Sequence, residues 1–510
     1  MSTRLFSSAI SGIDAKLIEV EADSFPGLHS FTVVGLPDKS VQEAKDRISS
    51  AIKNSGFQAP NRKHKKIVVN LAPADVKKEG SSYDLPIALS FLVETNQLKF
   101  DSSKILFMGE LSLNGSLKPT NGVLASAILA KNSGFKEIVI PFLNSTEATV
   151  VDGLNVIGAK TITEVVNHLN EINRISPAFP PKIKPSKENE LSLFTSIQGQ
   201  ESAKRGISIA AAGFHNVLLW GPPGSGKTLL SRSIVELMPK MLASESLEVA
   251  KIYSSIGLLK DNPLSLERPF RSPHHTTSAP AIVGGGAWPK PGEISLAHRG
   301  VLFLDEFPEF PRNVLEALRQ PLEEGKITVS RSAGSVELPA KFMLTAAMNP
   351  CPCGNNGEEK LVCVCSPISI LRYRKKISGP LLDRIDIQLN VPRETIIKSN
   401  LKKQENSENP IKKIALARDI QQNRFKGSGI LFNSEINYKN IDKYCVLSQK
   451  ADELLNRAVN NNSLSLRSYH KIKKLARTVA DMDDSDLIEE KHVAEAIRLR
   501  INDKMASDLV

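Results

Sequence analysis

The chain has 510 residues, more than one hydrophobic core usually organises, so we expect about two to four domains. Hydrophobic residues make up 41% and charged residues 24%, as in ordinary globular proteins, while aromatic residues at 5% argue against a surface built on base stacking. The formal net charge of +11 favours a polyanionic partner such as nucleic acid, although solvated lysines alone give the same excess.

Targeting and membrane segments are not expected. Residues 1–12 contain no apolar run of signal-peptide length, and no stretch of about 18 apolar residues could cross a bilayer. We therefore expect a cytoplasmic protein without a membrane partner.

The first 170 residues alternate strand-like and helical patterns. Apolar runs at residues 67–71, 105–108 and 137–140 favour strands, and residues 85–95 and 122–133 favour helices. This alternation predicts an α/β domain.

Three further regions follow in an α/β multidomain fold. Residues 171–190 are rich in Pro and Lys, which predicts an extended linker. Residues 191–395 form a second α/β domain, and residues 396–510 form a helical domain after a polar loop at 400–410. The helical prediction rests on an apolar stripe with interleaved basic residues: Tyr469, Ile472, Leu475, Ala476 and Val479.

A phosphate-binding loop opens the second domain. The apolar run 216–220 and the helical pattern 229–238 enclose a complete G-x-x-x-x-G-K-T motif: Gly221, Pro222, Pro223, Gly224, Ser225, Gly226, Lys227 and Thr228. Backbone N–H groups of such a loop cradle phosphates, Lys227 would reach the β- and γ-phosphates of ATP, and Thr228 would bind Mg²⁺. The alternative is a chance Gly-rich turn.

Two acids end the next apolar run, residues 300–304. Ligands gather at the carboxyl ends of buried parallel strands, so Asp305 fits a Mg²⁺ partner and Glu306 fits the base that polarises water. Without the phosphate loop, the pair would be an ordinary solvated strand end.

Three polar residues could complete the site. Asn349 ends the apolar run 342–348 and would orient water beside the γ-phosphate, unless it only starts the turn at Pro350. Arg384 and Arg467 each lie amid apolar residues, and phosphoryl transfer needs such cations. Structural salt bridges are the alternative for both arginines.

Four cysteines form two close pairs, Cys351-x-Cys353 and Cys363-x-Cys365, with nine residues between them. Four thiolates suit a structural Zn²⁺, because zinc prefers four soft ligands in a tetrahedron. A loop of reduced thiols is the alternative.

Several basic segments could contact the phosphates of a polyanion. They are residues 62–66, residues 372–376, the region near Arg331, and the set Arg268, Arg271, His274 and His275. Such a run is by itself more often a solvated face than a binding site, and His274-His275 could instead bind a metal.

Together these residues resemble the magnesium-chelatase-like branch of AAA+ ATPases, and specifically the YifB/ComM family, over nearly the whole chain. The segments that carry the resemblance are 197–200, 268–278, 348–354, 379–386 and 466–470. The resemblance implies a homohexamer with ATP between subunits. It makes Asn349 the sensor-1 residue, Arg384 the arginine finger and Arg467 the sensor-2 residue.

The first domain is similar to the proteolytic domain of Lon, which has a fold like domain 2 of ribosomal protein S5. The resemblance places Ser82 at the catalytic serine, but Leu124 stands where the general-base lysine belongs. A serine without a base is a weak nucleophile, so we expect a non-proteolytic relative. Lys118 is a substitute base without support from spacing.

The combined reading is an ATP-dependent ring motor that acts on DNA as a translocase or helicase. The family implies branch migration during natural transformation, with branched or single-stranded DNA as partner. One alternative is the motor subunit of a magnesium-chelatase-like complex. Another is an ATPase that remodels or regulates a protein partner.

Overall fold

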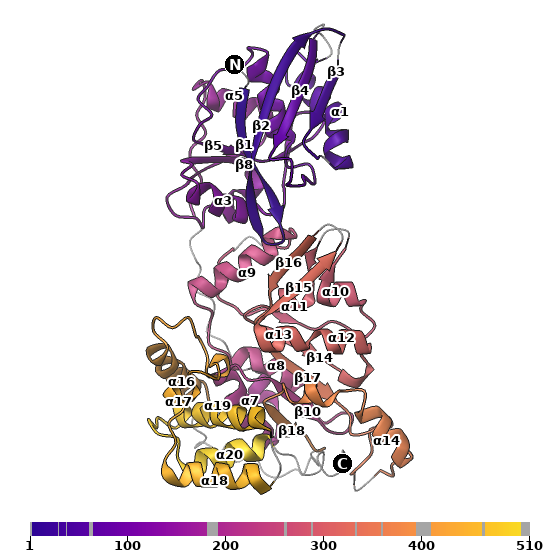
Figure 1. The fold of residues 1–510 in the computed structure, drawn as a ribbon, viewed down its shortest axis with the longest axis vertical. Helices are drawn as coiled ribbons and strands as arrows, with labels where there is room; N and C mark the ends of the chain where they lie inside the picture. Colours follow the sequence, from indigo (N-terminus) through magenta and orange to yellow (C-terminus); the bar gives the residue numbers. More distant parts are fainter. Residues whose placement is uncertain are drawn as a thin grey trace. The chain divides into compact units, whose positions relative to one another are not determined.

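The computed structural model describes residues 3–28, 30–36, 38–60, 65–180, 192–259, 263–286, 289–331, 334–358, 361–393, 410–461 and 465–500. The predicted loop at 400–409 and most of the basic segment 62–66 lie outside these ranges. The chain divides into two compact units (Figure 1). The first contains Met1–Pro185 and Leu242–Ser265, and the second contains Ser186–Met241 and Leu266–Val510.

A mixed seven-stranded sheet forms the centre of the first unit, in the order β3-β4-β2-β1-β5-β8-β9 (Figure 1). Strand β2 pairs antiparallel with both β1 and β4, and the other neighbours are parallel. The strands are β1 (Thr3–Ser11), β2 (Asp14–Pro26), β3 (Ser30–Val34), β4 (Lys65–Ala72), β5 (Ile105–Phe107), β8 (Glu137–Pro141) and β9 (Asn155–Ala159). The predicted strands at 67–71, 105–108 and 137–140 are confirmed as β4, β5 and β8.

Helices cover this sheet because their apolar side chains are buried against it. The predicted helices are confirmed as α2 (Asp84–Glu94) and α3 (Val123–Asn132), both with mostly buried residues. The remaining elements are α1 (Lys39–Asn54), the short pair β6 (Glu110–Leu111) and β7 (Leu117–Lys118), η2 (Phe142–Asn144), α4 (Ser145–Ala148) and α5 (Ile162–Leu169).

Helix α9 (Ala243–Ser255) also belongs to the first unit, although it follows the phosphate loop in sequence. It packs against α3, and Ala250 joins the hydrophobic cluster that contains Leu124. The backbone N–H of Gly122 donates to the Ser254 carbonyl at 2.8 Å. Residues from the middle of the chain therefore complete the core of the first unit.

A parallel five-stranded sheet forms the centre of the second unit, in the order β11-β14-β17-β10-β18. Its strands are β10 (Val217–Trp220), β11 (Phe270–Arg271), β14 (Val301–Leu304), β17 (Met343–Met348) and β18 (Ile387–Asn390). Every residue of β10, β14 and β17 is buried, as their continuous apolar runs predict. The carboxyl ends of these three strands carry the predicted site residues.

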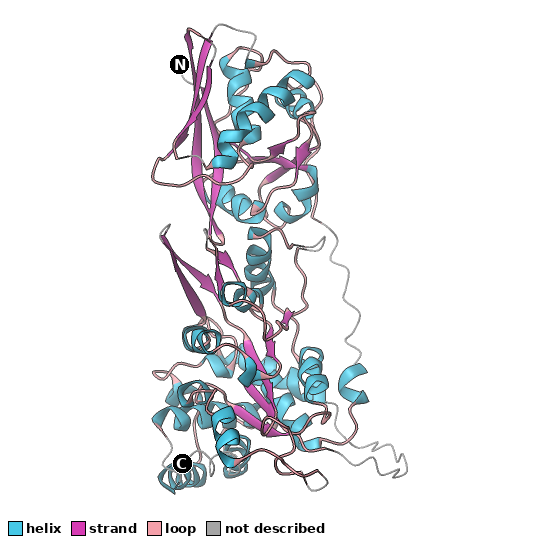
Figure 2. Cartoon of the chain, turned by 90° about the vertical axis from the view of Figure 1, so that its right-hand side faces the viewer, coloured by secondary structure: helices cyan, strands magenta, loops and turns pink. Residues whose placement is uncertain are grey.

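Short elements surround this sheet. Figure 2 shows the helices in cyan and the strands in magenta. Strands β15 and β16, which Figure 1 labels, pair antiparallel. The elements are α6 (Ser192–Ser196), α7 (Glu201–Gly213), α8 (Lys227–Leu237), α10 (Ala279–Val283), β12 (Gly284–Gly285), β13 (Lys290–Pro291), α11 (Glu293–Leu296), η3 (Phe307–Glu309), α12 (Arg312–Ala317), α13 (Arg319–Glu324), β15 (Lys326–Arg331), β16 (Gly334–Pro339), α14 (Pro367–Arg374) and α15 (Gly379–Leu382).

The last part of the chain is helical and shares one hydrophobic core with the parallel sheet. The predicted apolar stripe lies on α19, where Ile472, Leu475, Ala476 and Val479 are fully buried. The elements are α16 (Pro410–Arg424), η4 (Asn433–Glu435), α17 (Ile441–Tyr444), α18 (Gln449–Asn461), α19 (Leu466–Met482) and α20 (Glu490–Arg500). No helix in the described ranges is long and apolar enough to cross a membrane.

Candidate nucleotide-binding site and four-cysteine loop

The phosphate-loop residues connect β10 directly to α8, as the motif requires. Gly224 and Gly226 have φ angles of 74° and 91°, a region that glycine adopts without strain. Lys227 Nζ lies inside the loop and donates to the carbonyl oxygens of Gly221 and Pro222, each at 2.7 Å. Ser225 Oγ is buried without a hydrogen-bond partner among the described residues, which suits a group that would meet a phosphate oxygen.

The phosphate loop lines a pocket of about 690 Å³. Its walls come from the phosphate loop, α8, the segment after β11, and the ends of β14 and β17. The lining residues are Pro223, Gly224, Ser225, Gly226, Lys227, Thr228, Leu229, Arg232, Ser272, Pro273, His274, His275, Phe303, Asp305, Glu306 and Asn349. The volume falls within the range of small-molecule and cofactor sites.

The geometry of two oxygen donors fits a magnesium ion. Thr228 Oγ1 donates to Asp305 Oδ2 at 3.0 Å, so a hydroxyl and a carboxylate meet at the pocket floor. Hard divalent cations prefer such oxygen ligands and are usually held by few protein groups and the phosphates of the substrate. Thr228 and Asp305 are therefore the residues that would hold Mg²⁺.

Glu306 follows Asp305 into the pocket in a left-handed conformation, with φ 51° and ψ 45°. Non-glycine residues adopt this region rarely, and those that do cluster at functional sites. Glu306 Oε2 lies 3.0 Å from Nδ1 of His275. The two neighbouring acids therefore have different partners, Asp305 with Thr228 and Glu306 with His275.

Asn349 lies at the end of β17, beside the loop lysine. Its Oδ1 accepts a hydrogen bond from Lys227 Nζ at 3.3 Å. Its backbone N–H hydrogen-bonds to the buried Tyr373 side chain. Burial lowers the pKa of Lys227 to about 8, although the charge of Asp305 opposes this shift. Phosphates entering the pocket would favour the ammonium form of Lys227.

The two candidate arginines lie together but outside this pocket. Arg384 and Arg467 each bind one carboxylate oxygen of Glu323, and Arg384 also donates to the Pro380 carbonyl at 2.7 Å. These ion pairs lower the pKa of Glu323 even though burial opposes the shift. Neither arginine is among the described residues that line the pocket.

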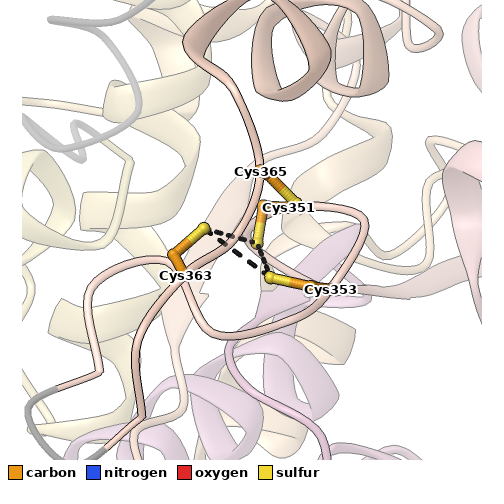
Figure 3. A group of neighbouring side chains, drawn as sticks. All are labelled: Cys351, Cys353, Cys363 and Cys365. Carbon is orange, nitrogen blue, oxygen red and sulfur yellow. Dashed lines mark hydrogen bonds between the residues drawn. The ribbon is translucent and has the colours of Figure 1, made fainter.

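The four clustered cysteines come together in one loop after β17 (Figure 3). The sulfur of Cys351 lies 3.4 Å from that of Cys353 and 3.7 Å from that of Cys363, and Cys353 and Cys363 are 3.6 Å apart. All four sulfurs, Cys365 included, lie within 4.8 Å of one another and remain free thiols. Zn–S bonds of about 2.3 Å in a tetrahedron separate sulfurs by about 3.8 Å, so the cluster fits zinc.

The cysteine loop packs against the nucleotide site. A Cβ on Gly354 would lie 2.5 Å from Cδ of Pro223 in the phosphate loop, so only glycine permits this approach. Arg374 Nε donates to the Pro350 carbonyl at 3.2 Å, between Asn349 and Cys351. The backbone N–H of Asn355 lowers the pKa of the Cys353 thiol to about 6, whereas burial and hydrogen bonds with Cys353 and Cys351 raise the pKa of Cys363 and Cys365.

Two of the basic residues expected to contact a polyanion are instead structural. Arg268 is buried and donates to the carbonyls of Pro239 and Arg299 at 2.7 and 2.6 Å. Arg374 is buried as well. Of the other basic residues, Arg62, Lys63 and His64 lie outside the described residues, as does the Arg331 side chain.

Three cationic or polar pocket residues do not follow from the sequence motifs of the nucleotide site. Arg232 lies one turn after Thr228 on α8 and adds a cation to the pocket wall. His274 and His275 were expected on a surface that contacts a polyanion or a metal, but they line the pocket. The i to i+4 spacing on the helix could have revealed Arg232, whereas the histidines lie in a loop whose path no pattern predicts.

The chain is similar to known proteins of the magnesium-chelatase family over nearly its whole length. Three family models match: "Subunit ChlI of Mg-chelatase" over residues 20–144, "Magnesium chelatase, subunit ChlI" over 193–399 and "Magnesium chelatase, subunit ChlI C-terminal" over 404–500. The chain is 43% identical to competence protein ComM of Haemophilus influenzae, covering 97% of both chains. It is 40% identical to protein YifB of Escherichia coli, covering 98% of this chain and 96% of that one.

A true chelatase component is more distant. The magnesium-chelatase 38 kDa subunit of Rhodobacter capsulatus is 26% identical over 33% of this chain and 53% of its own length. The full-length matches, by contrast, include both compact units. The chain therefore belongs to the magnesium-chelatase ChlI family, as a ComM-like AAA+ ATPase.

Proposed function

We propose that this protein is a cytoplasmic, ring-forming ATPase motor that translocates on or remodels DNA as a homohexamer. One observation carries the motor part of this proposal. Lys227, Asp305, Glu306 and Asn349 converge on one pocket, while the pair Arg384 and Arg467 lies elsewhere on Glu323. Phosphoryl transfer often uses an arginine from a neighbouring subunit, and we propose that these two arginines, which lie outside their own pocket, serve the adjacent one.

The chain's own residues then divide the work of hydrolysis. The backbone of the phosphate loop and Lys227 bind the phosphates of ATP, and Thr228 and Asp305 hold Mg²⁺, which neutralises charge on those phosphates. Glu306 accepts a proton from the attacking water, and Asn349 orients that water. Arg384 is the proposed arginine finger that reaches a neighbour's nucleotide, and Arg467, the proposed sensor-2 residue, shares the Glu323 carboxylate with it.

The domains carry distinct roles in this proposal. Residues 1–170 form a Lon-like domain without proteolytic activity, since Leu124 is fully buried in its core and Lys118 is exposed. Residues 171–190 link it to the motor core at 191–395, of which the segment Leu242–Ser265 belongs to the first unit, and residues 396–510 form the helical lid. A zinc ion bound by the four cysteines would stabilise the core.

DNA is the proposed substrate for two reasons. The chain has a net charge of +11, and its full-length relative in Haemophilus influenzae is named a competence protein. Branched DNA formed when incoming strands are integrated, as in natural transformation, is the structure on which such a motor would promote branch migration.

Forked or four-way-junction DNA should therefore stimulate ATP hydrolysis by the purified protein. The stimulation should fall steeply as salt rises, because binding releases counterions from DNA phosphates. Lys227→Ala should be inactive under all conditions. Hydrolysis that is indifferent to every DNA would contradict the DNA substrate and leave the ATPase intact.

Mixed rings test whether the arginines act on a neighbouring subunit. Arg384→Ala and Lys227→Ala should each be inactive alone, but mixing them should restore hydrolysis. About a quarter of interfaces in a random one-to-one ring would join an intact phosphate loop to an intact arginine. No recovery, in rings shown by native mass spectrometry to contain both variants, would contradict the shared site.

A magnesium-chelatase motor is the second candidate, because all three matching family models describe chelatase subunits. Such a motor would hydrolyse ATP without DNA and respond to a porphyrin-binding partner. The DNA-stimulation measurement separates the two functions directly. An ATPase that remodels proteins is the remaining alternative, and it would respond to neither DNA nor a chelatase partner.

A further inference from the structure

His275 is a histidine in contact with the proposed general base. The segment after β11 enters the nucleotide pocket, where Nδ1 of His275 lies 3.0 Å from Oε2 of Glu306. The His275 side chain is 29% exposed and that of Glu306 is 55% exposed. The His275 ring also meets the Phe310 ring edge-on, with centroids 6.4 Å apart. The imidazole is therefore held between an aromatic ring and a carboxylate.

The first residues of this segment are fixed to β14, the strand that precedes Glu306. Phe270 and Arg271 pair with Val301 and Leu302 of β14. Arg271 binds the Glu293 carboxylate through two hydrogen bonds, of 2.6 and 2.7 Å. These contacts hold the segment in register with the end of β14, so His275 can set the position of the Glu306 side chain.

Glu306 needs such a restraint. Its carboxylate is half exposed and sits on a side chain with three rotatable bonds, after a left-handed backbone turn. Within the described residues, His275 is the polar side chain that contacts this carboxylate. A general base must lie within hydrogen-bonding reach of its water, and a misplacement of about 1 Å can cost about 100-fold in rate.

The neighbouring His274 has a different task. Its ring packs on His275 with centroids 4.2 Å apart, and its Nδ1 hydrogen-bonds to Thr276 Oγ1 at 2.9 Å. That bond closes the turn locally, while only the second ring of the pair faces the carboxylate.

We propose that His275 is a positioning residue for ATP hydrolysis: its ring N–H donates to Glu306 and holds the carboxylate where it can polarise the attacking water. This inference rests on the proposed role of Glu306. His275 then orients the general base Glu306, which in turn faces the attacking water. Other catalytic sites likewise use a hydrogen-bonding partner to orient the base.

The test compares three substitutions by steady-state ATP hydrolysis and by binding of a fluorescent ATP analogue. His275→Ala should lower kcat by about 10- to 100-fold with unchanged nucleotide affinity. His275→Asn places an amide N–H near the position of Nδ1 and should recover most of the rate. His275→Gln places its amide beyond that position and should not. A matching thermal midpoint for all three verifies that the variants are folded.

A double-mutant cycle separates this inference from the proposed function. In a Glu306→Gln background, His275→Ala should add no further loss, because the carboxylate that it positions is gone. Glu306→Gln with normal turnover would overturn the role of Glu306 itself. An inactive Glu306→Gln beside a fully active His275→Ala would overturn only the role of His275. Equal losses in the Asn and Gln variants, or lost nucleotide affinity, would also overturn it.

Discussion

Glu306→Gln should slow ATP turnover by about 100- to 10,000-fold while ATP binding is retained. The amide cannot accept a proton from water, and loss of a general base lowers the rate by about 100- to 10,000-fold. The phosphate-binding groups remain, because Lys227 and Thr228 are bonded to the loop carbonyls and to Asp305 rather than to Glu306. The variant should therefore bind ATP analogues with normal affinity and accumulate ATP-bound rings.

Glu309→Gln is the matched control for this variant. Glu309 lies three residues further on and pairs with Lys376 at 2.8 Å, outside the nucleotide pocket. It should hydrolyse ATP at the normal rate. Single-turnover hydrolysis with radiolabelled ATP makes the comparison, and normal turnover in Glu306→Gln would contradict the assignment of the base.

Removing zinc from the four-cysteine loop should destabilise the motor core. We expect about one zinc per chain, measured by a colorimetric chelator after denaturation under reducing conditions. The double change Cys353→Ser and Cys363→Ser should lose the metal and lower the thermal midpoint, because metal binding contributes directly to folding. Nucleotide affinity should fall as well, since Gly354 packs on Pro223 and the loop follows Asn349.

Cys445→Ala is the control variant, because it removes a thiol that lies outside the four-cysteine cluster. Cys445 is buried in the helical region and takes no part in the cluster, so this variant should keep its full zinc content. Metal-free protein that shows the same thermal midpoint with and without added zinc would contradict the zinc site.

Sequence patterns predicted the parts of the site that depend on neighbouring residues. The strands β10, β14 and β17 are continuous apolar runs, and parallel strands place their carboxyl ends at one edge of a sheet. Lys227, Asp305 and Asn349 therefore follow from the motifs and the strand order. The two cysteine pairs are also close in sequence, so the cluster of four sulfurs could be predicted from their spacing.

Contacts between distant segments were not predictable in this way. Helix α9 follows the phosphate-loop helix in sequence yet packs on α3. The apolar residues of α9 do not show which hydrophobic core they join, so this packing was not predictable. The pairing of Arg384 and Arg467 with Glu323 joins residues 61 and 144 positions apart. His275 reaches Glu306 through a loop whose course depends on Arg271 and Glu293.

The central claim is that ATP hydrolysis moves this protein along DNA, and strand displacement tests it most directly. Wild-type protein with ATP and Mg²⁺ should release a fluorescent strand from forked or four-way-junction DNA, while Lys227→Ala and Glu306→Gln should release none. Release that stops when a non-hydrolysable ATP analogue replaces ATP would agree with the motor. Active hydrolysis without displacement of any branched substrate would contradict it.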